Sequence, residues 1–148
     1  MKIVAENRKA HHEYFILDTY EAGIKLTGTE IKSVRANKVN INDSYVVIKD
    51  LKVWAINMNI AKYDNGNIFN HDETRARELL LHKHEILKLF NKVKLDGCTI
   101  VPLKLYFKDA LLKVEIALCK GKNQRDKRED MKKRDQEMMV RKAMKNNY

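Results

Sequence analysis

Residues 112–119, LKVEIALC, decide the fold expected for this chain. Apolar side chains occupy every second position of the segment: Leu112, Val114, Ile116 and Leu118. Alternation with a period of two is typical of a β-strand that has one face in the core and one face in water. The pattern therefore predicts a strand, with Lys113 on its wet face.

The segments around this strand are also rich in β-forming residues. The run CTIVPLKLYF (98–107) precedes it across a short turn, and Pro102 predicts a bulge or an edge because proline cannot donate a ladder hydrogen bond. SYVVIKD (44–50) and KVWAINM (52–58) are nearly adjacent, as in a tight hairpin, and YFIL (14–17) predicts another strand. Several short strands with few helices predict a small antiparallel barrel.

Two segments carry the features of helices. Thr27, followed three residues later by Glu30, forms a capping box that predicts a short helix. Residues 73–93 predict a longer amphipathic helix, with Asp72 as its cap. This segment contains three consecutive leucines, 79–81, so at least one of them must point away from the core.

The charge of the chain favours a polyanionic partner. It carries 30 Lys and Arg against 20 Asp and Glu, a net charge of +10, and basic side chains that neutralise phosphates release condensed counterions. Nucleic acid is the first candidate. No apolar run approaches the ~18 residues needed to span a bilayer, and the first residues lack the apolar segment of a signal peptide. We therefore expect a cytoplasmic protein with no membrane partner.

The sequence gives little basis for a catalytic or metal site. Cys98 and Cys119 form no CxxC motif, and we expect reduced, buried thiols, although adjacent strands could also bring them within disulfide range. His82 and His84 would diverge on a helix, so we expect no metal. No phosphate-binding loop or nucleophile motif occurs. We predict no catalytic residues, no cofactor and no enzyme activity.

The last part of the chain cannot build a core of its own. From Lys120 to Tyr148 there are eleven Lys and Arg against five Asp and Glu, which is more than half of the net charge. Acidic residues precede basic ones by four positions in three pairs: Glu129–Lys133, Asp130–Arg134 and Glu137–Arg141. Such pairs contribute about 0.2–0.5 kcal/mol each, so an isolated helix stays marginal. We predict a folded unit over 1–120 and a basic tail over 121–148 that is disordered when free and helical when bound to RNA.

Five blocks of sequence occur in order: NRKAHHEY (7–14), YEAGIKLTGTEIKSVRANKVNINDSYV (20–46), RARELLLHKHEI (75–86), VPLKLYFKDALLKVEIALCKGK (101–122) and DKR (126–128). Together they resemble the SmpB family, the tmRNA-binding (SsrA-binding) proteins of bacterial trans-translation, over residues 7–145. The resemblance implies a mainly β fold with flanking helices, in which an OB-like antiparallel β-barrel carries the C-terminal basic tail.

The resemblance also implies an adaptor rather than an enzyme. Proteins of this family bind the tRNA-like domain of tmRNA and deliver it, in its alanyl form with elongation factor Tu and GTP, to ribosomes stalled on broken messages. They replace the missing codon–anticodon stem, and their tail occupies the empty mRNA channel beyond the decoding centre of 16S rRNA. The expected partners are therefore tmRNA, the ribosome and elongation factor Tu.

Matching positions imply tmRNA contacts at Asn7, Glu21, Leu80, Lys113 and Gly121. The Asn7 amide can donate and accept hydrogen bonds toward RNA. The Glu21 carboxylate can accept from base amino groups or 2′-hydroxyls, or it can orient a neighbouring Arg or Lys. Leu80 would contact a base or ribose, and Lys113 a phosphate. From the residues alone, the alternatives are that Glu21 is a solvated strand end, Leu80 is core and Lys113 is a solvated lysine.

The same matching implies ribosome contacts. His12 would stack on an exposed base in the decoding centre. The remaining positions are Lys122, Asp126, Lys127, Arg128, Lys132, Lys133, Arg134, Arg141, Met144 and Lys145. Less specific phosphate attraction is expected from Lys32, Arg35, Lys38, Arg75 and Arg77. Glu78 stands where the family carries a positive charge, which argues against a phosphate contact at that position.

Two other functions remain open. A general basic RNA-binding or RNA-chaperone module of the translation machinery would have the same charge and fold. A nuclease would need metal-binding carboxylates, for which the sequence offers Asp18, Glu21 and Glu30.

Overall fold

The computed structural model of this chain describes residues 1–63 and 70–122. The predicted ribosome contacts from Asp126 to Lys145, and the predicted conformation of the tail, lie outside the described residues.

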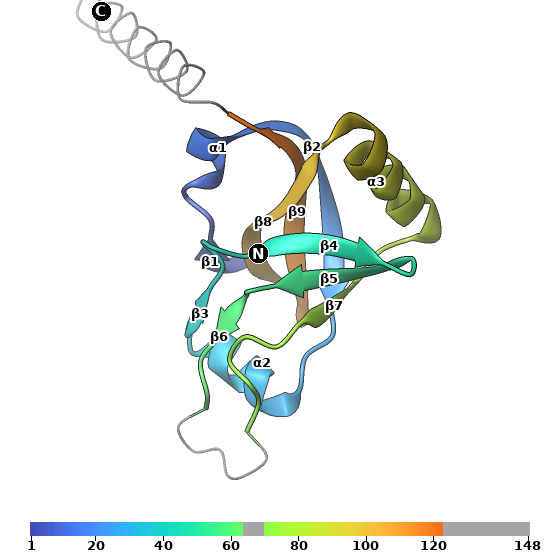
Figure 1. The fold of residues 1–148 in the computed structure, drawn as a ribbon. Coiled ribbons are helices and arrows are strands. Elements are labelled where there is room, and N and C mark those ends of the chain that lie inside the picture. The colour runs from blue at the N-terminus through green and yellow to red at the C-terminus, as the bar shows by residue number, and fades with distance from the viewer. Residues whose placement is uncertain (64–69, 123–148) are drawn as a thin grey trace, which may run out of the picture.

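Six antiparallel strands close into a barrel (Figure 1). Around the ring they are β8 (Thr99–Lys108), β4 (Tyr45–Lys49), β5 (Lys52–Ile56), β7 (Arg77–Leu80), β2 (Tyr14–Ile24) and β9 (Leu111–Gly121), which pairs again with β8. β1 (Lys2–Glu6) also pairs with β8, and β3 (Val39–Asn40) pairs with β6 (Asn59–Ile60) in a separate small sheet. The mainly β fold with flanking helices is confirmed.

The β2–β9 ladder is the backbone of the barrel. It runs from the Tyr14–Gly121 pair to the Gly23–Lys113 pair, so β2 is much longer than the predicted strand. Val114, Ile116 and Leu118 lie in the core as the alternation predicts. The other face of β9 is not wet throughout, because Ala117 and Cys119 are buried too. Cys119 packs under the short helix α1 (Ala10–Glu13) in a second apolar cluster.

Pro102 and the two cysteines behave as the sequence predicts. The register of β8 against β9 shifts between Pro102 and Lys104, which is the expected bulge. Cys98 and Cys119 are free thiols, both buried. Burial raises the pKa of Cys119 to about 11, so this sulfur remains a protonated thiol at neutral pH.

The capping box forms as predicted at the start of α2 (Gly28–Arg35). The Glu30 N–H donates to the Thr27 hydroxyl at 3.4 Å, and the Thr27 N–H donates to the Glu30 carboxylate at 2.8 Å. Glu30 is nevertheless fully buried, which a helix cap alone does not require.

The long helix predicted over 73–93 is wrong in its first half. Its place is taken by β7, and α3 (Lys83–Asp96) begins only after the leucines. Leu79 is 2% exposed and Leu80 is 47% exposed, which is the alternation of a strand. The pairing of β7 with β5 and β2 prevails over the local preference for helix, because it completes the barrel.

The predicted cap and the predicted divergence of two histidines are also wrong. Asp72 accepts a hydrogen bond from the Thr74 N–H at 3.0 Å and caps no helix. At the true start of α3, the Glu85 carboxylate accepts from the His82 N–H at 3.1 Å. Because His82 precedes the helix in extended backbone, its ring stacks on His84 with the ring centres 5.6 Å apart.

Within residues 1–63 and 70–122, no helix has the length and apolar character needed to cross a bilayer.

Candidate nucleic-acid interface

Three of the residues predicted to contact tmRNA share one outer face of the barrel. Gly23 on β2 pairs with Leu80 on β7 and with Lys113 on β9. Lys113 in turn pairs with Tyr106 on β8. Since alternate residues of a strand share a face, Glu21 lies on the same side as Gly23. We call the surface formed by these five residues the β2–β9 face.

Leu80 is the leucine that points away from the core. It is 47% exposed, whereas Leu79 is in the core and Leu81 packs against it. A Cβ atom at Gly23 would lie 3.4 Å from the Leu80 Cβ. This is an ordinary van der Waals distance, so the Leu80 side chain lies directly over Gly23 of β2 and offers an apolar surface to solvent.

Glu21 is held in place by two neighbours on β8. Its Oε2 accepts a hydrogen bond from the Tyr106 hydroxyl at 2.5 Å, and its Oε1 lies 3.9 Å from the Lys108 ammonium. The Tyr106 hydrogen bond lowers the pKa of Glu21, and Lys108 and Lys113 act in the same direction. Burial, and then Glu21, raise the pKa of Tyr106, so its hydroxyl remains a donor. The carboxylate is thus charged and oriented at neutral pH.

The β2–β9 face carries both signs of charge. Glu21 faces Glu115 across the ladder, and Glu115 lies 3.6 Å from the Lys104 ammonium. Lys113 has no ion-pair partner within 4 Å in the described part of the chain. A surface with a free cation beside oriented carboxylates can recognise base edges and hydroxyls as well as phosphates.

A hollow of about 310 Å³ opens beside Leu80 and Lys113. Apolar side chains of β2 and of the β8–β9 turn line it, together with Arg35 from α2. Of the basic row predicted on this helix, Arg35 therefore borders the β2–β9 face. Lys32 instead lies over the ring of Tyr63, with its ammonium 5.3 Å from the ring centre.

Gly121 and His12 lie together at the opposite end of the ladder. Gly121 pairs with Tyr14 at the end of β9, and the Lys122 N–H donates to the Glu13 carbonyl at 2.8 Å. The chain therefore leaves the barrel beside α1, which carries the exposed His12 (Figure 1). The predicted ribosome contacts His12 and Lys122 are brought together, whereas Gly121 is separated from the β2–β9 face.

The separation between these two regions follows from the strand itself. Lys113 and Gly121 are eight residues apart on β9, or about 26 Å at ~3.3 Å per residue. Figure 1 shows α1 and α2 at opposite ends of the barrel. The described part of the chain thus has two distinct ends, one with the β2–β9 face and one with His12 and the start of the tail.

Asn7 is buried rather than presented on a surface. It is 6% exposed, its N–H donates to the Leu103 carbonyl at 2.7 Å, and its Nδ2 donates to the Pro102 carbonyl at 3.2 Å. Its Oδ1 is buried and has no hydrogen-bond partner in the described part of the chain. In this arrangement the amide fastens the β1–α1 connection to β8.

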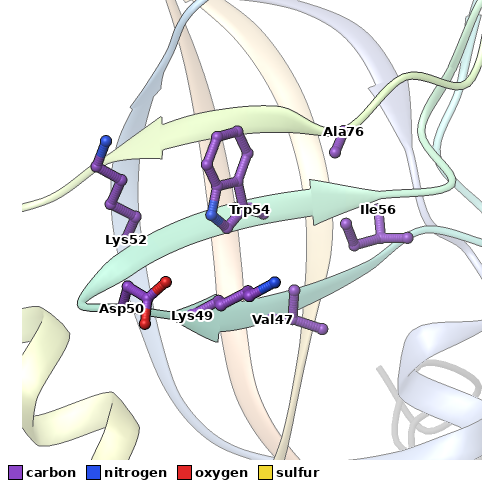
Figure 2. Close-up of a pocket in the computed structure, with 7 residues that line it drawn as sticks. All are labelled: Val47, Lys49, Asp50, Lys52, Trp54, Ile56 and Ala76. Atoms are coloured by element: carbon purple, nitrogen blue, oxygen red, sulfur yellow. The ribbon is translucent and has the colours of Figure 1, made fainter.

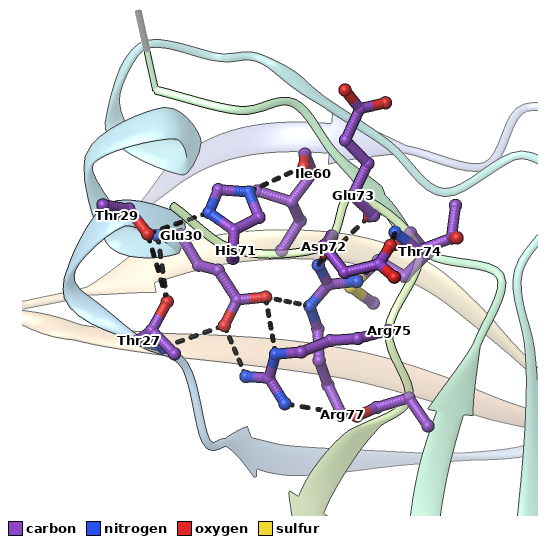
Figure 3. Close-up of polar contacts among 12 residues, drawn as sticks. Thr27, Thr29, Glu30, Ile60, His71, Asp72, Glu73, Thr74, Arg75 and Arg77 are labelled. Atoms are coloured by element: carbon purple, nitrogen blue, oxygen red, sulfur yellow. Dashed lines mark hydrogen bonds and ion pairs between the residues drawn. The ribbon is translucent and has the colours of Figure 1, made fainter. Parts of the chain in front are cut away.

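Arg75 and Arg77 do not supply the phosphate attraction expected of them. Both guanidinium groups pair with the Glu30 carboxylate (Figure 3). Arg77 is fully buried and donates to Glu30 Oε2 and to the Met58 carbonyl, each at 2.5 Å. For Arg77 the prediction is wrong because β7 is a strand whose odd positions, Arg77 and Leu79, point inward. Arg75 precedes β7 and is partly exposed, and its guanidinium is engaged by Glu30. No pattern of the local sequence distinguishes these arginines from exposed ones.

Glu78 lies in an ion pair. Its carboxylate is 3.3 Å from the Lys25 ammonium across the β2–β7 pair. This arrangement agrees with the expectation that position 78 offers no phosphate contact.

The carboxylates considered for a nuclease do not come together. Asp18 and Glu21 are three residues apart on β2, so their side chains leave opposite faces of the strand. Glu30 is buried between two arginines. Across residues 1–63 and 70–122, no group of three His, Cys, Asp or Glu side chains could hold a metal ion.

Comparison with known proteins identifies the family. The family model described as SmpB protein matches residues 4–146. The SsrA-binding protein of Carboxydothermus hydrogenoformans is 52% identical over 99% of both chains, and that of Ligilactobacillus salivarius is 54% identical over 97% of this chain and 92% of the relative. A solved structure described as "tmRNA-SmpB: a journey to the center of the bacterial ribosome" is 47% identical, with a TM-score of 0.67, over 84% of this chain and 91% of that chain. The chain belongs to the SmpB family.

Proposed function

We propose that this protein is a tmRNA-binding adaptor of trans-translation. Its β2–β9 face binds the tRNA-like domain of tmRNA, and the protein brings tmRNA to stalled ribosomes so that the nascent peptide is tagged and the ribosome is rescued. The observation that carries the proposal is the convergence of Glu21, Leu80 and Lys113 on one outer face. The relatives of this chain carry the name SsrA-binding protein, which supports the same RNA as the ligand.

The two-ended shape supports a second contact with the ribosome. We assign His12 and the segment that begins at Gly121 to the decoding centre and the mRNA channel, because His12 and Gly121 lie at the end remote from the β2–β9 face. In this scheme residues 1–120 form the tmRNA-binding unit and 121–148 form the tail. Elongation factor Tu with GTP joins through alanyl-tmRNA, and the reaction takes place in the cytoplasm.

The buried position of Asn7 assigns it a positioning role. Its two donated hydrogen bonds fix the connection between β1 and α1, which carries His12. We therefore attribute the importance expected of Asn7 to the placement of this connection, and direct recognition to Glu21, Leu80 and Lys113.

A competition assay tests the function. Labelled tRNA-like domain of tmRNA is bound to the full chain and displaced with unlabelled tRNA-like domain, bulk tRNA or duplex RNA at a fixed salt concentration. We expect the tRNA-like domain to compete about a hundredfold better than the others, because specific contacts add to the shared phosphate attraction. Equal competition would favour a general RNA-binding or chaperone module, and Mg²⁺-dependent cleavage of the RNA would favour a nuclease.

Glu21→Ala is expected to weaken binding of the tRNA-like domain by about 10- to 100-fold, since hydrogen bonds to a charged group contribute ~1.5–3 kcal/mol. Tyr106→Phe keeps the carboxylate but removes the hydroxyl that orients it, so a smaller loss of about threefold to tenfold is expected. Filter binding or fluorescence anisotropy measures both affinities.

Asp18→Asn is the matched control for these two variants. It lies on the same strand as Glu21 but on the opposite face, and the Asn side chain can still accept from the Thr19 N–H. Wild-type affinity is expected. An equal loss for Asp18→Asn and Glu21→Ala would show that charge on β2, rather than the β2–β9 face, governs binding.

A further inference from the structure

A second surface with the chemistry of an RNA site lies on the β4–β5 hairpin. A hollow of about 520 Å³ opens on the outer side of the hairpin, within the ~300–1,000 Å³ range of ligand sites (Figure 2). Its apolar lining consists of Val47, Trp54, Ile56 and Ala76. Val47 and Trp54 are directly opposite each other on the two strands, and Trp54 is the only tryptophan of the chain.

Two lysines border the hollow, and neither forms an ion pair within the described part of the chain. Lys49 and Lys52 are directly opposite each other at the end of the hairpin, and like charges in this position destabilise a β-ladder. Neither has an ion-pair partner within 4 Å among residues 1–63 and 70–122. The only acidic side chain that lines the hollow is Asp50, in the turn. The arrangement suits an anion that both ammonium groups can reach.

The turn makes this pairing unavoidable. Asp50 and Leu51 form a two-residue connection in which both have positive φ, 53° and 60°. Positive φ at both central residues is the geometry of a tight hairpin turn whose twist matches that of the strands. The lysines are therefore held opposite each other by the backbone rather than by chance side-chain conformations.

The hollow faces away from the β2–β9 face. Around the ring of six strands, β4 is three places from β2 and β5 is three places from β9. The hairpin and the β2–β9 ladder thus form opposite walls of the barrel. An RNA domain seated on the β2–β9 face leaves the Trp54 side turned outward, toward whatever surrounds the complex.

We propose that this hollow binds one unpaired nucleotide of ribosomal RNA, with the base stacked on Trp54 and a phosphate held by Lys49 and Lys52. An aromatic side chain beside cationic ones is the combination that binds single-stranded nucleic acid, because every base has a π-face and every phosphodiester linkage carries a negative charge. Ribosomal RNA is the partner because the hollow lies opposite the surface assigned to tmRNA. The inference rests on that assignment in the proposed function.

Tryptophan fluorescence tests the chemistry of the site directly. Because Trp54 is the only tryptophan, titration of the full chain with a short unstructured RNA oligonucleotide reports binding at this residue even if the tail also binds RNA. We expect saturable quenching, and about a tenfold weaker apparent affinity in Lys49→Ala/Lys52→Ala. Absence of quenching, or equal quenching of both proteins, would overturn the proposal.

Co-sedimentation with ribosomes tests the identity of the partner. Trp54→Ala and the double lysine variant are expected to bind 70S ribosomes about tenfold more weakly and the tRNA-like domain of tmRNA as well as the wild type does. Trp54→Phe should restore most of the ribosome binding, since a second aromatic ring can stack. Lys83→Ala/Lys88→Ala on α3 removes the same charge elsewhere and should bind ribosomes like the wild type.

Each other outcome contradicts the proposal in a distinct way. If Trp54→Ala and the double lysine variant lost only tmRNA binding, the hollow would be assigned to tmRNA. If they bound both tmRNA and ribosomes like the wild type, the hollow would have no role in RNA binding. If the variants bound intact ribosomes more weakly but bound protein-free ribosomal RNA like the wild type, the partner of the hollow would be a ribosomal protein. Failure of the proposed function is detected separately, because Glu21→Ala would then leave binding of the tRNA-like domain unchanged.

Discussion

A chain that ends at Lys122 is expected to bind the tRNA-like domain of tmRNA within about threefold of the full-length affinity but to lose tagging on stalled ribosomes completely. The cut follows the last described contact, the hydrogen bond from the Lys122 N–H to the Glu13 carbonyl. The cut lies beyond Gly121, which is itself about 26 Å along β9 from Lys113, so the β2–β9 face is unaffected. Ending the chain at Gly121 would remove this contact as well and so be a less clean variant.

The salt dependence of tmRNA affinity distinguishes the loss of a specific contact from the loss of general electrostatic attraction. The removed residues 123–148 carry nine Lys and Arg against five Asp and Glu, so their removal lowers general attraction to RNA. Any difference in tmRNA affinity should therefore shrink as the salt concentration rises above ~0.15 M, where screening acts within ~8 Å. A large loss of tmRNA affinity at every salt concentration would place the tail in the tmRNA site. Full-length Glu21→Ala, with weak tmRNA binding and an intact tail, is the converse control.

Glu30→Gln is expected to lower the free energy of unfolding by about 3–5 kcal/mol, the cost of leaving a buried charge unpaired. Arg77 would remain fully buried without its carboxylate partner. Domains are usually stable by only ~5–15 kcal/mol, so the variant could lose a large part of its stability. Urea denaturation followed by circular dichroism measures the change.

The contacts of Arg77 explain why one residue has this much effect. Besides Glu30 it donates to three backbone carbonyls, those of Met58, Asp72 and Glu73. It therefore ties β7 to α2, to the segment before β6 and to the residues that lead into β7 (Figure 3). Removal of Glu30 disturbs all of these connections at once.

The control for Glu30 is the exposed ion pair between Lys92 and Asp96 on α3, whose charged atoms are 3.3 Å apart. Asp96→Asn should change the free energy of unfolding by less than about 1 kcal/mol, as is usual for pairs in water. If Glu30→Gln had an equally small effect, the buried network would not contribute to stability.

The same network predicts a pH dependence. Burial raises the pKa of Glu30, but hydrogen bonds from Arg75, from the Thr27 N–H and from Arg77 outweigh it, and the net pKa lies below the ordinary value of 4.5. A carboxyl with a lowered folded-state pKa contributes full stability above its unfolded pKa and loses it as the pH falls through the folded value. The difference in unfolding free energy between wild type and Glu30→Gln should therefore narrow below pH 4.5. A constant difference from neutral to acidic pH would contradict the charged network.

Much of the fold was predictable from local patterns. Alternation in 112–119, the hairpin around residues 50 and 51 and the capping box at Thr27 all appear in the structure, because each depends on neighbours in the sequence. The segment 77–80 was not predictable in this way. Its leucines fit a helix and a strand equally well, and only the strands on either side of it in the barrel decide between them.

The sequence by itself determined the basic charge, the strand periods, the composition of the tail and the blocks that mark the SmpB family. Only the tertiary structure decided which side chains meet. Glu21 and Lys113 are far apart in the chain and share a face because β2 and β9 pair, while Arg77 and Asn7 are polar in sequence and buried in the fold. Strand pairing and burial depend on contacts between distant segments, and a local pattern of residues does not encode those contacts.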